Sequence, residues 1–143
     1  MVQSKDCIAK WGSPSNFNEG KFMTLWDIPN NINSAIPELP NRLYCNKVMV
    51  APLERAFNNI ISRNLTEEVE AWDGCFNIRK KRRLNSWSLH SWGIAVDINA
   101  ARNRLGKEPE MSAELVQCFT DAGFEWGGNW TRKDGMHFQL KKI

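Results

Sequence analysis

Two short segments alternate apolar and polar residues, and this alternation is the strongest constraint on the fold. In GIAVDIN, residues 93–99, every second residue is a branched aliphatic one, and Asp97 falls between them. In MHFQL, residues 136–140, His137 falls between large apolar residues in the same way. This period of two predicts half-buried β-strands, because successive side chains of a strand point to opposite faces of the sheet. If the two strands are neighbours, Asp97 and His137 lie on the same face of the sheet.

Two helices are predicted by apolar residues at helical spacing. The first has its apolar stripe within residues 53–61, with Pro52 tolerated in its first turn. The second follows Ser112, a suitable N-cap, and stops before Gly123.

The rest of the chain adds two strand candidates and two loops. Residues 21–28 and 69–79 are the further strand candidates, whereas 12–20 and 29–41 are rich in Pro, Asn, Ser and Gly and are expected to be loops. Helices combined with a small, mainly antiparallel sheet give the α+β class.

The composition is that of an ordinary globular protein with a net charge of +3. Residues 79–83, RKKRR, could contact a polyanion, but a solvated basic loop explains this run equally well. The four cysteines form no CxxC pair, and no segment resembles a signal peptide or a membrane span. We therefore expect free thiols and a chain that is made and kept in a reducing cytoplasm.

The chain has only two histidines, and each has an aspartate nearby. His90 precedes Asp97 by an odd number of residues, so a straight strand would put them on opposite faces, and Gly93 between them permits a bend. Two imidazoles and a carboxylate are the ligand set of a catalytic zinc, with water in the fourth position, although other divalent metals also accept these donors. Asp134, three residues before His137, is placed to act as a general base. The residues alone leave a purely structural role for the histidines open.

The two histidine segments also resemble a known family. SLHSWGIAVD, residues 88–97, matches the pattern SxHxxGxAxD, and DGMHF, residues 134–138, has an acidic residue three before a histidine. Together they resemble the zinc D-Ala-D-Ala carboxypeptidase and L-alanyl-D-glutamate endopeptidase family, which shares its fold with lysostaphin-type peptidases and the hedgehog signalling domain. GCFNIR and GFEWGGNW resemble the phage endolysin members of the family. The similarity extends over about residues 46–138.

The resemblance implies a metal site and a catalytic base. One zinc ion per chain would be held by His90, Asp97 and His137. Asp134 would activate water and then pass a proton to the leaving amine; it is an aspartate where many relatives carry glutamate.

The resemblance also places an arginine at the site. Arg79 would stabilise the oxyanion of the tetrahedral intermediate, since a fixed guanidinium acts strongly on developing charge. Arg82 or Arg83 would serve instead if the register shifts.

Four further residues are candidates for the substrate cleft. Ser88 lies where the family hydrogen-bonds substrate, and the alternative that it orders its own loop stays open. Trp92 is expected to be partly packing and partly cleft wall. Trp130 and Trp126 flank GGN and are candidate walls, with core packing expected for one of them.

The resemblance predicts a zinc metallopeptidase that hydrolyses the peptide stem of bacterial peptidoglycan, as a phage endolysin with L-alanyl-D-glutamate endopeptidase activity. We expect one peptidase domain over residues 1–143, with residues 1–45 packed on it and no separate wall-binding domain. We also expect a monomer that does not insert into membranes and stays in the host cytoplasm until it is released to the wall. The alternatives are a D-Ala-D-Ala carboxypeptidase and a non-catalytic, zinc-containing binding module; nucleic-acid binding through residues 79–83 is the weakest.

Overall fold

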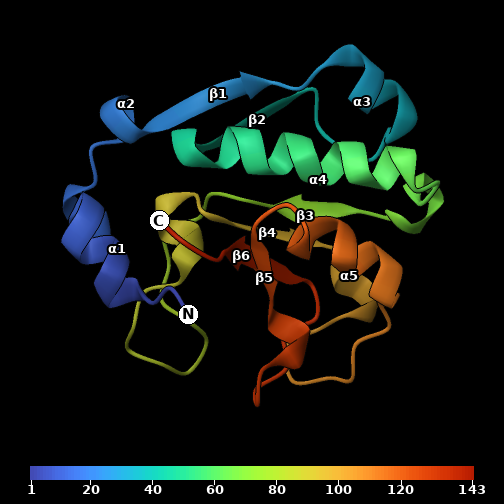
Figure 1. Ribbon diagram of the computed structural model, residues 1–143. Coiled ribbons are helices and arrows are strands. Elements are labelled where there is room, and N and C mark those ends of the chain that lie inside the picture. Colours follow the sequence, from blue (N-terminus) through green and yellow to red (C-terminus); the bar gives the residue numbers. More distant parts are fainter.

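The computed structural model describes residues 1–143 as an α+β fold, which confirms the predicted class (Figure 1). The helices are α1 (Ser4–Trp11), α2 (Glu19–Phe22), α3 (Asn30–Ala35), α4 (Val50–Ser62) and α5 (Ala113–Thr120). The strands are β1 (Met23–Asp27), β2 (Arg42–Asn46), β3 (Trp72–Gly74), β4 (Ala95–Ile98), β5 (Phe124–Trp126) and β6 (His137–Leu140).

The strands form two antiparallel sheets where the sequence predicted one. β1 pairs with β2, and the other four strands pair in the order β3-β4-β6-β5. The two predicted histidine-segment strands, β4 and β6, are neighbours at the centre of the larger sheet.

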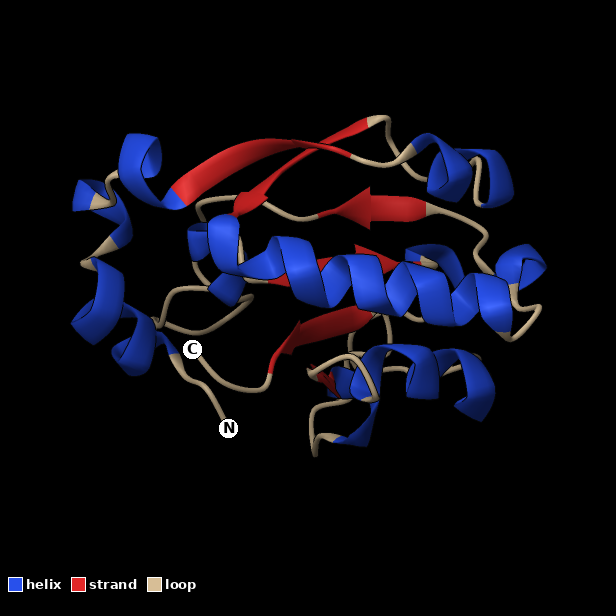
Figure 2. Cartoon of the chain, turned by 45° about the horizontal axis from the view of Figure 1, so that its top comes forward, coloured by secondary structure: helices blue, strands red, loops and turns tan.

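In Figure 1, helix α4 lies between the small sheet and the larger one, and Figure 2 shows it crossing in front of the larger sheet. Phe57 stacks on Trp26 of β1 with ring centroids 6.3 Å apart, and it meets Trp72 of β3 edge-on at 6.2 Å. Helix α5 packs beside α4, where the Asn59 side chain donates a hydrogen bond of 3.0 Å to the Cys118 carbonyl. Aromatic packing thus joins the small sheet to the sheet that carries the histidine segment.

Both predicted helices are confirmed. α4 carries Pro52 in its first turn, where a missing N–H costs no helical hydrogen bond. Ser112 caps α5 by accepting a hydrogen bond of 3.0 Å from the Leu115 N–H. Gly123, with φ +106°, follows the end of that helix.

Several boundaries differ from the prediction. The strand expected over residues 69–79 is reduced to the three residues of β3, where the pairing with β4 is irregular. The segment 29–41, predicted as a loop, contains α3, which has one buried anchor, Ile32, and no apolar stripe to reveal it. The segment 12–20 likewise includes a short 3₁₀-helix at Pro14–Asn16 and the start of α2. Strands β2 and β5 were not predicted. β5 has only three residues, too few to show a period, whereas β2 was missed although Leu43 and Cys45 alternate with exposed residues.

The N-terminal segment contributes to the same hydrophobic core as the rest of the chain. Cys7 and Trp11 of α1 belong to one cluster of buried residues that also contains Phe57 and Phe138. All four cysteines are free and buried, as expected. None of the helices combines the length and the apolar composition that a membrane span requires. The number of domains stays a prediction.

Gly93 supplies the bend that the spacing of His90 and Asp97 requires. His90 lies on a 3₁₀-helix, Leu89–Trp92, and β4 begins only at Ala95. Gly93 between them is left-handed, with φ +69° and ψ 28°. A Cβ at this position would lie 2.8 Å from the backbone nitrogen of Asn46, which itself donates to the Gly93 carbonyl. The predicted bend is confirmed, and a side chain has no room there.

We expect Gly93→Ala to lower the free energy of unfolding by about 3 kcal/mol, since it adds the left-handed penalty to a backbone clash. Gly106→Ala is the matched control: Gly106 has φ +83° but nothing within 4 Å of the added Cβ, so about 1 kcal/mol is expected. Urea unfolding of both variants measures the difference. Equal losses of unfolding free energy in the two variants would contradict the predicted clash at Gly93.

Candidate metal centre

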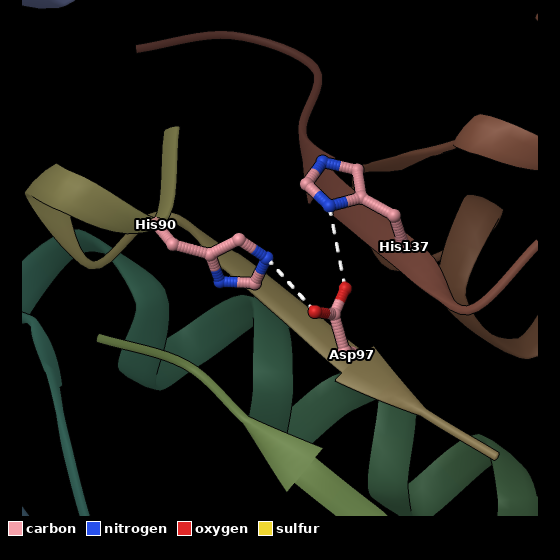
Figure 3. Close-up of side chains that lie close together, drawn as sticks. All are labelled: His90, Asp97 and His137. Atoms are coloured by element: carbon pink, nitrogen blue, oxygen red, sulfur yellow. Dashed lines mark ion pairs between the residues drawn. The ribbon is translucent and has the colours of Figure 1, made fainter. Parts of the chain in front are cut away.

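Three side chains with metal-binding atoms converge on the wall of the larger sheet (Figure 3). Asp97 of β4 lies directly opposite His137 of β6 in the antiparallel register, and His90 approaches from the 3₁₀-helix before β4. The distance from Asp97 Oδ2 to His90 Nε2 is 3.2 Å, and that from Asp97 Oδ1 to His137 Nδ1 is 3.4 Å. The structure therefore brings together all three residues predicted as ligands, and their role as ligands stays a prediction.

Hydrogen bonds on the far side of each imidazole fix its tautomer. His90 Nδ1 lies 2.6 Å from the Cys75 carbonyl oxygen, which can only accept, so Nδ1 carries the proton. His137 Nε2 lies 3.0 Å from Gln139 Oε1, so Nε2 carries the proton of that ring. In the neutral forms, the lone pairs of His90 Nε2 and His137 Nδ1 therefore both face Asp97.

This arrangement fits a cation. His90 Nε2 and Asp97 Oδ1 are buried and have no hydrogen-bond partner, and lone pairs that face one another in a buried site repel. Ligand atoms about 2.0–2.1 Å from a tetrahedral metal lie about 3.3 Å apart, which matches both distances to Asp97. The donor atoms are those of a divalent-metal site, and each histidine has the outer hydrogen bond that such ligands usually have.

Electrostatics keep Asp97 ionised despite its position. Burial opposes ionisation, but the close approach and positive charge of His137 and His90 hold the pKa of Asp97 well below its usual range. Burial likewise opposes a charge on His137, yet its interactions with Asp97 raise the pKa of the imidazole above its ordinary value. In the metal-free protein the carboxylate therefore attracts a proton to the His137 imidazole, and a metal must compete with that proton.

Asp134 lies beside the three residues, with Oδ2 3.9 Å from His137 Nδ1. Burial raises its pKa and is the largest influence, while the positive charge of His137 lowers it. A turn fixes its backbone: the Asp134 N–H donates to the Gly127 carbonyl at 2.9 Å. A Cβ on Gly127 would lie 2.6 Å from the Asp134 carbonyl oxygen, so this turn requires glycine.

Arg79 lies at the edge of the site, and it is the arginine of residues 79–83 whose charge lowers the pKa of Asp134. Ser91 anchors its backbone, because Ser91 Oγ accepts from the Arg79 N–H at 3.2 Å. Arg79, Arg82 and Arg83 are all exposed, so only the influence of Arg79 on Asp134 separates it from the other two. The position favours Arg79 among the three candidates, and its catalytic role stays a prediction.

The four candidate cleft residues differ in their burial and in the groups that they contact. Ser88 is buried, and its Oγ accepts from the His90 N–H at 3.3 Å, which supports the alternative that it orders its own loop. Trp92 is fully buried and its indole N–H donates to the Gly12 carbonyl, so the expectation that it forms part of the cleft wall is wrong. Trp126 packs under the GGN turn and donates to the Gly135 carbonyl. Trp130 is partly exposed, with its ring 5.4 Å from that of His137, and stays the candidate wall.

Gln139 has a place at the site that the sequence did not assign. It is buried, and its side chain contacts the His137 ring. The alternation in residues 136–140 puts Gln139 on the same face as His137, and this pattern could have assigned Gln139 to the site from the sequence.

Residues 81–140 match the sequence model of a family described as D-alanyl-D-alanine carboxypeptidase. The match confirms the predicted resemblance. It also confirms the prediction of a peptidase. The matched segment contains His90, Asp97, Asp134 and His137, whereas Arg79 lies just before it. The matched segment is shorter than residues 46–138, over which the motifs predicted the similarity.

Among solved structures, the L-Ala D-Glu endopeptidase ChiX of Serratia marcescens is similar to this chain. The two are 21% identical, with a TM-score of 0.43, and the similarity covers 68% of this chain and 80% of that chain. A search of curated proteins finds no match.

We expect the purified protein to bind one divalent metal ion at neutral pH and to lose affinity as the pH falls. Protons and metal compete for the same lone pairs, and the raised pKa of His137 makes this competition start at a higher pH than for an ordinary imidazole. Calorimetric titration with Zn²⁺ between about pH 5 and pH 8 measures the effect. An affinity that does not change over this range would contradict binding through the imidazoles.

Proposed function

We propose that this protein is a zinc metallopeptidase that hydrolyses the peptide stem of bacterial peptidoglycan. The observation that carries the proposal is the convergence of two imidazole lone pairs and a buried carboxylate beside a second, desolvated carboxylate, Asp134. The family match over residues 81–140 supports peptidase chemistry at this place.

The donor set favours zinc. His90, Asp97 and His137 offer two nitrogens and one oxygen without a thiolate, and three protein ligands leave a fourth position open. A zinc ion held there would act as a Lewis acid, which would polarise the scissile carbonyl and make a water molecule nucleophilic at neutral pH.

Asp134 is suited to move the proton. Its partly buried carboxyl has a raised pKa, so it accepts a proton more readily than an exposed aspartate. Asp134 takes the proton from the attacking water and then gives it to the leaving amine, so the same group serves as base and acid in turn.

Two residues at the rim complete the proposed site. The Arg79 guanidinium, close enough to influence Asp134, stabilises the negative charge that develops on the carbonyl oxygen. Trp130, packed against His137 and partly open to solvent, forms one side of the peptide cleft.

For the bond that is cut, we propose the one between L-alanine and D-glutamate, in a phage endolysin that stays in the host cytoplasm until it is released to the wall. The segments GCFNIR and GFEWGGNW, which resemble endolysin members of the family, support this choice. The second candidate is a D-Ala-D-Ala carboxypeptidase, which the description of the matching family favours.

We expect Asp134→Asn and Asp134→Ala to keep one zinc ion per chain and to lose turnover by about 10²–10⁴-fold, because the proton carrier is gone. His137→Ala should lose both metal and activity. Asp121→Asn, which changes an exposed carboxylate paired with Arg63, is the control and should stay active. Metal analysis and release of soluble fragments from cell walls are the two measurements. Wild-type protein that binds zinc but releases nothing would instead support a binding module.

The products of one peptidoglycan digest decide between the two bonds. We expect mass spectrometry to show stems cleaved after L-alanine, with no free D-alanine. Release of free D-alanine with otherwise intact stems would establish the carboxypeptidase instead.

A further inference from the structure

The first residues of the chain reach the candidate metal centre. The Gln139 side-chain amide donates a hydrogen bond of 3.1 Å to the Val2 carbonyl, and its oxygen accepts from His137 Nε2 at 3.0 Å. Gln139 is 3% exposed, so both bonds are sheltered from water. A chain of hydrogen bonds thus runs from the N-terminal backbone to one of the proposed ligands.

The Val2 carbonyl determines which way the amide of Gln139 points. A carbonyl oxygen can only accept, so the NH₂ end of the amide must face Val2 and the oxygen end must face His137. The oxygen then requires a proton on His137 Nε2, and this leaves the lone pair of Nδ1 directed at Asp97. With the amide reversed, an NH₂ group would face Nε2 and would favour the tautomer that cannot bind a metal through Nδ1.

The same N-terminal segment also holds the element that carries His90. The indole of Trp92, in the 3₁₀-helix Leu89–Trp92, donates to the Gly12 carbonyl at 2.8 Å. Helix α1, between Val2 and Gly12, is fixed by Cys7 and Trp11, which are 0% and 6% exposed. Figure 1 shows α1 and both termini on the same side of the molecule. Residues 1–12 therefore support both histidines, although they lie outside the family-matched segment.

We propose that Gln139 is a positioning residue of the metal centre and that residues 1–12, through the Val2 carbonyl, set its orientation and hence the metal-binding tautomer of His137. The inference rests on the proposed function in one respect: it takes the metal to bind through His137 Nδ1. The N-terminal segment is then part of the metal site and more than a structural cover.

Three variants separate this role from simple packing. Gln139→Leu keeps the volume but removes both hydrogen bonds, and we expect the Zn²⁺ dissociation constant to rise about 10–100-fold. Gln139→Glu keeps an acceptor for His137 Nε2 and cannot donate to Val2, so its affinity should stay within about threefold of the wild type. Deletion of residues 1–2 leaves Gln139 free to turn, and an intermediate loss of affinity is expected. Gln117→Leu, an exposed change on α5, is the control and should leave the affinity unchanged.

Zn²⁺ competition against a chelating indicator measures these affinities. ¹⁵N NMR of the metal-free protein, at a pH above the raised pKa of His137 where the ring is neutral, shows which nitrogen carries the proton. We expect the proton on Nε2 in the wild type and in Gln139→Glu, and a mixture of tautomers in Gln139→Leu. Unchanged affinity and tautomer in Gln139→Leu would overturn the inference, as would a loss in Gln139→Glu as large as that in Gln139→Leu. Wild-type protein that binds no zinc would overturn the proposed function, and the NMR result would then decide the tautomer role by itself.

Discussion

The pairing of β4 with β6 is the constraint on which the site depends. It places Asp97 opposite His137 and Ala95 opposite Gln139, so that the carboxylate, one imidazole and the amide share one face of the sheet. The opposite face of the same strands, with Val96 and Phe138, is completely buried in the core. A shift of the register by one residue would turn these polar groups into the core, which the apolar face prevents.

His90 is brought to the site by a turn of the chain, whereas His137 is placed by strand pairing. His90 cannot lie on the strand with Asp97, and the left-handed Gly93 turns the chain so that a 3₁₀-helix presents the imidazole from the side. The turn is held tightly: Asn46 at the end of β2 donates to the Gly93 carbonyl through its backbone and to the Trp92 carbonyl through its side chain. The small sheet therefore contributes to the site without supplying a ligand.

The environment of each polar group gives it a distinct property. Asp97 is kept ionised by two imidazoles, whereas burial raises the pKa of Asp134, so that two aspartates on one wall are suited to different tasks. The imidazoles depend on outer partners, the Cys75 carbonyl and the Gln139 amide, which direct their lone pairs at Asp97. Through Gln139 and Trp92, the N-terminal segment belongs to the same network.

The sequence by itself determined the faces of β4 and β6, the two main helices and the candidate ligands His90, Asp97 and His137, because alternation and helical spacing are local properties of the chain. The motif resemblance added the peptidase family. Only the tertiary structure decided that the strands form two sheets, that Trp92 belongs to the core, and that Val2 reaches Gln139. The hydrogen bonds from Trp92 to Gly12 and from Gln139 to Val2 join residues 80 and 137 positions apart in the chain, and no local pattern records which distant backbone carbonyl a buried donor will find.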